Sequence, residues 1–153
     1  MVGRERLCLA DYIRSVDSGD VDVVPLQVVT VGNEATKRFE ELQGKNEYTE
    51  AFYSHGLSVE AAEAVAEWAH RRIKSELGVD SGKRYSWGYG ACPDLDDHAT
   101  VFKLLPAKEA LGMELTEAFQ LMPEQSTAAV IIHHPEAKYY AVRGTAAQEQ
   151  AVA

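Results

Sequence analysis

The residues best suited to chemistry lie in one short stretch, residues 84–94. Arg84 opens it with a guanidinium fork that suits a carboxylate or a phosphate, and Tyr89 offers a ring face and a hydroxyl. Gly88 and Gly90 alternate with an aromatic and a small residue ahead of a proline, so the stretch is not helical. This composition fits either a loop that approaches a ligand closely or a connecting loop around a buried tyrosine.

Length, charge and cysteine content limit the class of protein. The 153 residues predict one domain that buries about two-thirds of its unfolded surface. The formal net charge of −9 argues against duplex DNA or an anionic membrane as the main partner, because both attract positively charged surfaces. No apolar run approaches the ~20 residues of a membrane span and no leader resembles a signal peptide, so a cytoplasmic protein is expected. Cys8 and Cys92 suggest neither a disulfide framework nor a zinc site.

The elements that position residues 84–94 begin with two segments of β character. Residues 7–12 predict a short strand. The β-branched run 21–31 predicts a second strand, in which Pro25 implies an edge position, a bulge or a break. A helix capped by Asn33 is expected to follow, as far as about Leu42.

The strongest pattern in the chain predicts a long central helix at about residues 57–77. Small and apolar side chains recur at helical spacing from Ser58, a candidate cap, until Gly78 stops the pattern. Residues 46–56 are in register as a candidate extension. Most charged residues on the other face of this helix are expected to be solvated, with Glu63 as the exception.

The C-terminal half predicts two short helices followed by strands. The first helix begins at Asp96 or Asp97 and ends at Pro106, and a shorter one covers residues 107–111. The strand-like segments, expected as antiparallel hairpin neighbours, cover residues 114–122, 126–133 and 138–142. Strands and helices without regular βαβ alternation predict an α+β fold.

The adjacent residues His133 and His134 invite a metal site. Neighbouring residues of a strand point to opposite faces, however, and no third ligand lies at a convincing spacing. Solvated or hydrogen-bonded histidines are therefore expected, and no metal site is predicted.

Four groups of residues, in order along the chain, resemble a known family. The third, at the candidate loop, is Arg84-x-x-x-Gly88-Tyr89-x-Ala91-Cys92-Pro93. The first is Leu7-Cys8-Leu9-Ala10-Asp11-Tyr12, and the second is Ala62-Glu63-Ala64-x-Ala66-Glu67 with His70. The fourth is Leu115-Thr116-Glu117-Ala118-Phe119, Met122-Pro123, Ser126 and His134-Pro135-Glu136-Ala137-Lys138-Tyr139-Tyr140-Ala141-Val142. Together they resemble the reactivation (S-adenosylmethionine-binding) domain at the C-terminus of cobalamin-dependent methionine synthase.

This resemblance covers about residues 7–150 of a single expected domain, residues 1–153. It implies a twisted antiparallel sheet flanked by helices, in agreement with the α+β pattern. The first half of the family domain, which includes an acidic residue of the ligand site, has no counterpart in the sequence. A short stand-alone form of the domain is therefore expected.

The resemblance also implies a ligand site. Arg84 would hold the methionyl carboxylate of S-adenosylmethionine, and the backbone at Ala91 would read the adenine edge. Glu63 would face the ribose hydroxyls or the ligand's ammonium group. The predicted site residues are Glu63, Arg84, Gly88, Tyr89, Gly90, Ala91, Tyr139 and Tyr140. The alternatives are core packing for the tyrosines and a surface carboxylate for Glu63.

Members of the family bind S-adenosylmethionine beside cobalamin, so that one-electron reduction of the oxidised cofactor, in some members by flavodoxin, is followed by irreversible methylation. The expected function is an accessory module for this reductive methylation on a separate corrinoid protein or core methionine synthase, with a flavodoxin-like or other electron donor. The sequence leaves open whether the chain counts as an enzyme. The alternatives are a non-catalytic corrinoid-protein-binding module, an S-adenosylmethionine sensor, and a remnant fold that acts as a homodimer.

Overall fold

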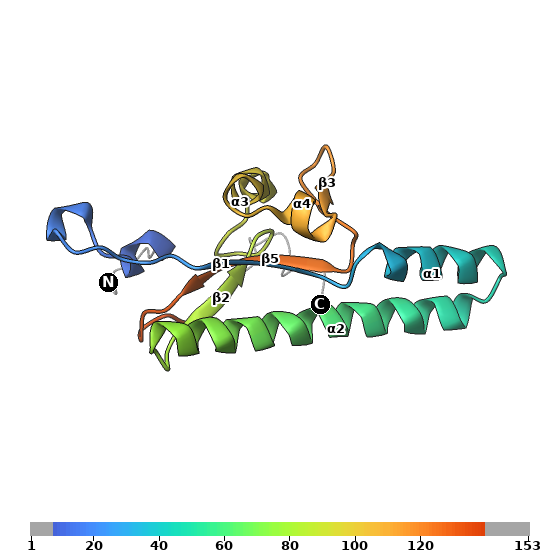
Figure 1. The fold of residues 1–153 in the computed structure, drawn as a ribbon, viewed down its shortest axis with the longest axis horizontal. Coiled ribbons are helices and arrows are strands. Elements are labelled where there is room, and N and C mark those ends of the chain that lie inside the picture. The colour runs from blue at the N-terminus through green and yellow to red at the C-terminus, as the bar shows by residue number, and fades with distance from the viewer. Residues whose placement is uncertain (1–7, 140–153) are drawn as a thin grey trace, which may run out of the picture.

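The computed structural model describes residues 8–139, which fold around a three-stranded antiparallel sheet (Figure 1). The strand order is β1 (Leu26–Thr30), β5 (Ser126–Ile132) and β2 (Lys83–Ser86). The central strand β5 pairs Ala128 with Val28 on one side and Val130 with Tyr85 on the other. The predicted α+β class and the antiparallel sheet are confirmed.

Two antiparallel helices, α1 (Asn33–Gly44) and α2 (Tyr48–Leu77), follow β1. Figure 1 shows α2 as a long helix with α1 over one end of it and the sheet over the other, while the N-terminal segment extends beyond it. Helix α2 ends where Gly78 adopts a left-handed conformation with φ 68°. Glycine tolerates this conformation without steric cost, so Gly78 ends the helix as predicted.

Helix α1 begins at Asn33 as predicted, whereas the predicted start of α2 at about residue 57 was wrong and residues 46–56 had been only a candidate extension. Helix α2 begins at Tyr48, so Ser58 lies inside it, and the Ser58 hydroxyl donates a hydrogen bond of 2.8 Å to the Ser54 carbonyl oxygen. Helix α2 continues through Gly56 because its preceding turns pack against α1, where Leu42 and Ala51 are buried. Asn33 is the first helical residue of α1 and makes no capping bond, since the N-cap is Gly32.

One face of the sheet packs closely on α2 through small residues. Ala62 and Ala66 are the most buried residues in the middle of the helix. The Gln27 Nε2 donates to the Ala66 carbonyl oxygen at 3.3 Å, which places that side of β1 against the helix. Residues directly opposite each other on paired strands lie on the same face of the sheet. Ala129, the cross-strand partner of Gln27, therefore faces α2 as well.

The other face of the sheet carries the remaining elements (Figure 1). They are α3 (His98–Leu104), α4 (Ala107–Leu111), and the two-residue strands β3 (Glu114–Leu115) and β4 (Leu121–Met122). An N-terminal segment joins them, and Tyr12, Tyr85, Ile132 and Ala137 form a buried cluster there. The two short helices occur where the sequence predicted them, within two residues.

The two N-terminal strand predictions need correction. Residues Leu9–Tyr12 form a 3₁₀ turn rather than a strand, because the Asp11 carboxylate accepts a bond of 2.8 Å from the Cys8 amide and closes the chain locally. Of the run 21–31, only Leu26–Thr30 is a strand. Pro25 lies just before its start, where a missing amide costs no ladder bond.

The three C-terminal segments also differ from the prediction. Residues 114–122 form a small hairpin, β3–β4, whose turn includes Phe119 with φ 58°. Strand β5 pairs with β1 and β2 rather than with a sequence neighbour. In the third segment, residues 138 and 139 are not in a strand, and residues 140–142 lie outside the described residues. None of the helices within residues 8–139 combines the length and the hydropathy that a membrane span requires.

Candidate functional site

A cavity of about 680 Å³ opens between α2, the β2 end of the sheet and the turn that follows β2. This volume is within the range of small-molecule sites, roughly 300–1,000 Å³. Six of the eight predicted site residues line it: Glu63, Arg84, Tyr89, Gly90, Ala91 and Tyr139. Gly88 does not line it, and Tyr140 lies outside the described residues. The chain thus brings together residues that are up to 76 positions apart, from Glu63 to Tyr139.

An ion pair between Arg84 and Glu63 spans the edge of this cavity. The Arg84 Nη2 lies 2.6 Å from the Glu63 Oε2. The arginine side chain is only 16% exposed, whereas the glutamate side chain is 50% exposed. The Arg84 Nη1 is buried and has no hydrogen-bond partner among the described residues. A buried donor without a partner costs about 1–3 kcal/mol, so this nitrogen is suited to an incoming anion.

The turn after β2 contributes residues 89–91 to the lining of the cavity. The Gly88 amide donates to the Cys92 carbonyl oxygen and the Cys92 amide donates to the Tyr89 carbonyl oxygen, each at 2.8 Å. Gly88 has φ 86°, and a Cβ there would lie 3.0 Å from the Leu95 Cδ2. Gly88 therefore shapes the turn, and the exposed ring of Tyr89 projects beside the cavity.

Aromatic rings line two further sides of the cavity. Tyr139 contacts Tyr85 edge to face at 5.7 Å between ring centroids, and the Lys83 Nζ lies 5.7 Å from the centre of the Tyr139 ring. On another side, Trp87 meets His98 edge to face at 5.6 Å. Ring faces at these positions can stack on a planar heterocycle or attract a cation.

Sequence reasoning missed several lining residues, among them Val59, Ser86, Trp87, His98 and Thr127. Trp87 lies within the candidate stretch and could have been proposed from its type. No sequence pattern indicated His98, because its position depends on how α3 folds over the sheet. Its Nδ1 lies 2.8 Å from the Phe119 carbonyl oxygen, which holds the ring in place.

Two weakly acidic side chains near the cavity, Cys92 and Tyr85, are held in their neutral forms. Burial raises the pKa of the Cys92 thiol, and the negative charge of Asp97 raises it further. Burial likewise raises the pKa of Tyr85, whose hydroxyl donates a bond of 2.8 Å to the Lys138 carbonyl oxygen. Neither side chain is therefore an activated nucleophile near neutral pH. The arrangement is suited to binding a ligand with an anionic end, a cationic group and a planar ring.

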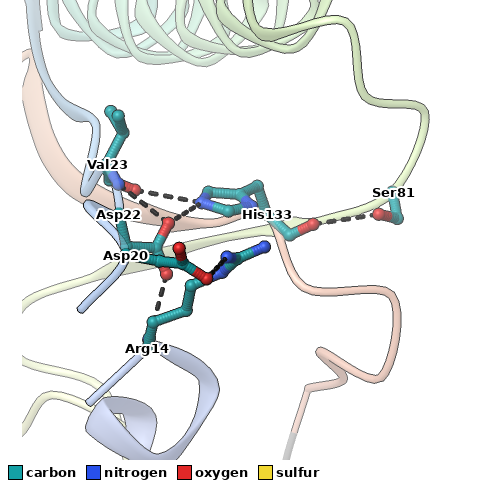
Figure 2. Close-up of polar contacts among 6 residues, drawn as sticks. All are labelled: Arg14, Asp20, Asp22, Val23, Ser81 and His133. Atoms are coloured by element: carbon teal, nitrogen blue, oxygen red, sulfur yellow. Dashed lines mark hydrogen bonds and ion pairs between the residues drawn. The ribbon is translucent and has the colours of Figure 1, made fainter. Parts of the chain in front are cut away.

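The two adjacent histidines serve local hydrogen bonds and packing. Figure 2 shows the His133 ring directed at Asp22 and Val23, and its Nε2 lies 3.1 Å from the Asp22 Oδ1 and 3.0 Å from the Val23 carbonyl oxygen. The His134 ring packs 5.3 Å from the Tyr12 ring. Among residues 8–139, no group of three or more potential ligands could hold a metal ion.

The Asp22 carboxylate also fixes the N-terminal segment. It accepts a hydrogen bond of 2.9 Å from the Arg14 amide, while the Arg14 side chain pairs with Asp20 at 2.7 Å (Figure 2). Backbone hydrogen bonds from Arg14 and from Val23 lower the pKa of Asp22. This cluster lies outside the residues that line the cavity and is structural.

Comparison with known proteins assigns this sequence to a family. The sequence model of the family "Vitamin B12 dependent methionine synthase, activation domain" matches residues 1–152. The methionine synthases of Mycobacterium tuberculosis (strain ATCC 25618 / H37Rv) and Mycobacterium leprae (strain TN) are 42% and 40% identical to this chain over 161 residues. Each alignment covers 89% of this chain and 13% of the relative, so the chain spans a small part of the length of these proteins.

A solved structure supports the same assignment. The crystal structure of the MetH reactivation domain bound to AdoHcy is 29% identical to this chain and superimposes with a TM-score of 0.81. The match covers 88% of this chain and 46% of that chain. Sequence and fold agree, and this chain belongs to the family of activation domains of vitamin B12 dependent methionine synthase.

Proposed function

We propose that the cavity binds S-adenosylmethionine and that the chain thereby supports reductive methylation of a cobalamin cofactor held by a partner protein. The observation that carries this proposal is the half-paired guanidinium of Arg84 at the cavity. One of its nitrogens is fixed by Glu63, and the other is buried without a partner among the described residues. A ligand carboxylate would satisfy that nitrogen with a charge-assisted hydrogen bond.

The other parts of the ligand have matching groups around the cavity. Glu63 is half-exposed, so its carboxylate can accept a bond from the ligand's ammonium group while it still orients Arg84. The rings of Tyr89 and Tyr139 offer faces for the adenine or for the sulfonium cation. The backbone at Ala91 is accessible because its side chain is small. The bound AdoHcy in the similar reactivation domain supports the same class of ligand.

The cobalamin of the partner, after one-electron reduction, would supply the methyl acceptor, and S-adenosylhomocysteine would be the product left in the cavity. The residues of this chain then contribute binding and orientation rather than covalent chemistry. Arg84 and Glu63 would fix the amino-acid end of the ligand, and the aromatic rings would fix its nucleoside. The sulfonium methyl group would point toward the open side of the cavity.

The partner would be a corrinoid protein or the core of a methionine synthase. The curated relatives are methionine synthases of which this chain matches 13%, which leaves room for cobalamin and substrate binding in other parts of such a protein. An electron donor, a flavodoxin-like protein or another reductant, is required for the one-electron step. A cytoplasmic location is consistent with these partners.

The test is a reconstitution in which methylcobalamin formation is followed by absorbance. It combines a cobalamin-loaded core methionine synthase, a reductant, S-adenosylmethionine and this chain. Methylcobalamin is expected to accumulate only when the chain is present, and much less with Arg84→Ala than with the matched control Arg72→Ala. Arg72 is exposed and paired with Glu76, away from the cavity. Accumulation that is independent of the chain would contradict the proposal.

A further inference from the structure

His98, the first residue of α3, is a buried histidine that lines the cavity with Arg84. Its Nδ1 lies 2.8 Å from the Phe119 carbonyl oxygen, and its ring meets Trp87 edge to face at 5.6 Å between ring centroids. The first contact comes from the turn between β3 and β4, and the second comes from the turn after β2. Together they hold the imidazole in one orientation.

The contact with Phe119 determines which ring nitrogen of neutral His98 carries the proton. A carbonyl oxygen only accepts hydrogen bonds, so the Nδ1 is the donor and the Nε2 is an unprotonated acceptor. No described residue forms a hydrogen bond with this Nε2. The buried side-chain atoms without a partner among residues 8–139 belong to Gln27, His70 and Arg84, so the His98 Nε2 is an accessible acceptor.

The direction of the Nδ1 bond indicates which way this acceptor faces. His98 lines two cavities, the one with Arg84 and a second of about 650 Å³ beside the β3–β4 hairpin. Phe119 belongs to the turn of that hairpin, so the Nδ1 is the nitrogen that faces the hairpin. The two nitrogens of an imidazole point in different directions. The Nε2 is therefore directed away from the hairpin, toward the cavity with Arg84.

Arg84 and His98 approach this cavity from opposite faces of the sheet. Arg84 pairs with Glu63 of α2, whereas α3 lies over the other face (Figure 1). Residues 89–91 of the turn after β2 also line the cavity. A ligand whose carboxylate meets Arg84 therefore extends its opposite end past this turn toward His98.

We infer that the His98 Nε2 accepts a hydrogen bond from the 6-amino group of the ligand's adenine and makes the site selective for a 6-aminopurine. The inference rests on the proposed function, which places the amino-acid end of S-adenosylmethionine at Arg84. Adenine carries a donor at its 6-position, whereas a 6-oxopurine carries an acceptor there. With a 6-oxopurine two acceptors would face each other, and a site that loses a buried hydrogen bond in this way rejects the analogue.

The backbone of Ala91, which also lines the cavity, does not provide this selectivity. A peptide unit carries both a donor and an acceptor, so it can meet either an amino or an oxo group. His98 offers only an acceptor, because its donor is held by Phe119. The histidine is therefore the specificity-determining residue at this end of the cavity.

The test compares S-adenosylhomocysteine with S-inosylhomocysteine, its 6-oxo analogue, by isothermal titration calorimetry. The inosyl ligand is expected to bind the unaltered chain about tenfold or more weakly. His98→Phe and His98→Gln are each expected to reduce this ratio to about threefold or less, because neither keeps an acceptor at the Nε2 position. His98→Gln can still donate to Phe119 and so preserves that contact. His134→Phe is the matched control, since His134 packs on Tyr12 and does not line the cavity.

Equal affinities of the unaltered chain for the two ligands would overturn the inference and leave the proposed function standing. An unchanged ratio in both His98 variants, or the same reduction in His134→Phe, would also overturn it. Binding of neither ligand would overturn the proposed function and the inference with it.

Nuclear magnetic resonance of the imidazole nitrogens tests the tautomer of His98 without any substitution. The expected result is a protonated Nδ1 and an unprotonated Nε2 whose resonance shifts when S-adenosylhomocysteine is added. A protonated Nε2 beside an unprotonated Nδ1, or an Nε2 resonance that the ligand does not move, would contradict the inference.

Discussion

The Arg84 Nη2 lies 2.6 Å from the Glu63 Oε2, and this contact joins strand β2 to the middle of α2 at the cavity. The pair fixes the plane of the guanidinium group, because one of its nitrogens is tied to the helix. The other terminal nitrogen stays buried without a partner among the described residues. The arginine is thus oriented before a ligand arrives, which lowers the entropic cost of binding.

Replacing Arg84 with alanine is expected to weaken S-adenosylmethionine binding by roughly 1.5–3 kcal/mol, the contribution of a charged hydrogen bond. The measurement is isothermal titration calorimetry on the purified variant. Arg72→Ala is the control, because Arg72 pairs with Glu76 on the exposed surface of α2 and does not line the cavity. An affinity of Arg84→Ala equal to that of the unaltered chain would refute the role of Arg84.

The stability of the chain is expected to fall as the pH falls below about 6.5, because of His70. Burial lowers the pKa of His70, and its Nε2 has no partner among the described residues. A histidine with a lowered pKa binds its proton more readily in the unfolded chain. Neutral His70 therefore costs the fold nothing when the pH is above the pKa of the unfolded chain. The free energy of unfolding decreases as the pH falls from there through the pKa of the folded chain.

Urea unfolding at about pH 7.5 and about pH 5.5 measures this effect. The free energy of unfolding is expected to be lower at the acidic pH, and His70→Gln is expected to reduce the difference. Asp22, whose pKa is lowered from 3.8, titrates below this window. An unchanged pH dependence in His70→Gln would show that other groups cause it.

Two glycines are expected to respond in opposite directions to replacement by alanine. Gly82 has φ 119°, and a Cβ there would lie 2.9 Å from the His133 Cα and the Ile132 carbonyl oxygen. Gly82→Ala should therefore lower the free energy of unfolding by more than about 1 kcal/mol. Gly56 lies inside α2 with open space around it, and Gly56→Ala should raise that free energy by about 0.5–1 kcal/mol. Chemical denaturation tests both, and effects of the same sign would contradict the backbone assignment.

The close contact between α2 and the sheet is expected to be intolerant of larger side chains. Ala66 is 0% exposed against the sheet, so Ala66→Leu should cost about 1–3 kcal/mol of stability through overpacking. Ala64→Leu, two residues away on the exposed side of the helix, should change stability by no more than about 0.5 kcal/mol. Thermal or urea denaturation compares the two variants. Equal losses would indicate that the helix is oriented differently.

The sequence specified the elements whose signals are local. Gly78 ends α2 because its left-handed conformation suits glycine, and the spacing of Ala62, Ala66 and Ala69 identified the side that meets another element. The α+β class followed from the order of the segments. Boundaries were less predictable, since Gly56 lies inside α2 where packing against α1 outweighs its low helix propensity.

Features that depend on tertiary pairing were not predictable in this way. Strand β5 pairs with β1 and β2, which are distant in sequence, so the expectation of hairpin neighbours among the last segments was wrong. The turn at Phe119 needed a left-handed conformation at a residue type that rarely adopts it. His70 belongs to the face of α2 that carries most of its charged residues, but it is buried because β1 and β5 pack on this helix.

The candidate site was also predictable only in part from the sequence. Arg84, Tyr89 and Ala91 came from one stretch of sequence, and the family resemblance added Glu63 and Tyr139. The cavity adds His98, whose position depends on the fold of α3 over the sheet. No periodicity connects His98 with Trp87, although the two rings are 5.6 Å apart. The binding roles of all these residues rest on the proposal above.

Titration of the chain with S-adenosylmethionine by isothermal titration calorimetry tests the central claim most directly. The account predicts saturable binding of one ligand per chain, with affinity that depends on Arg84 and Glu63. The absence of any binding heat at millimolar ligand, in a chain shown to be folded, would contradict the claim that this cavity is a working S-adenosylmethionine site.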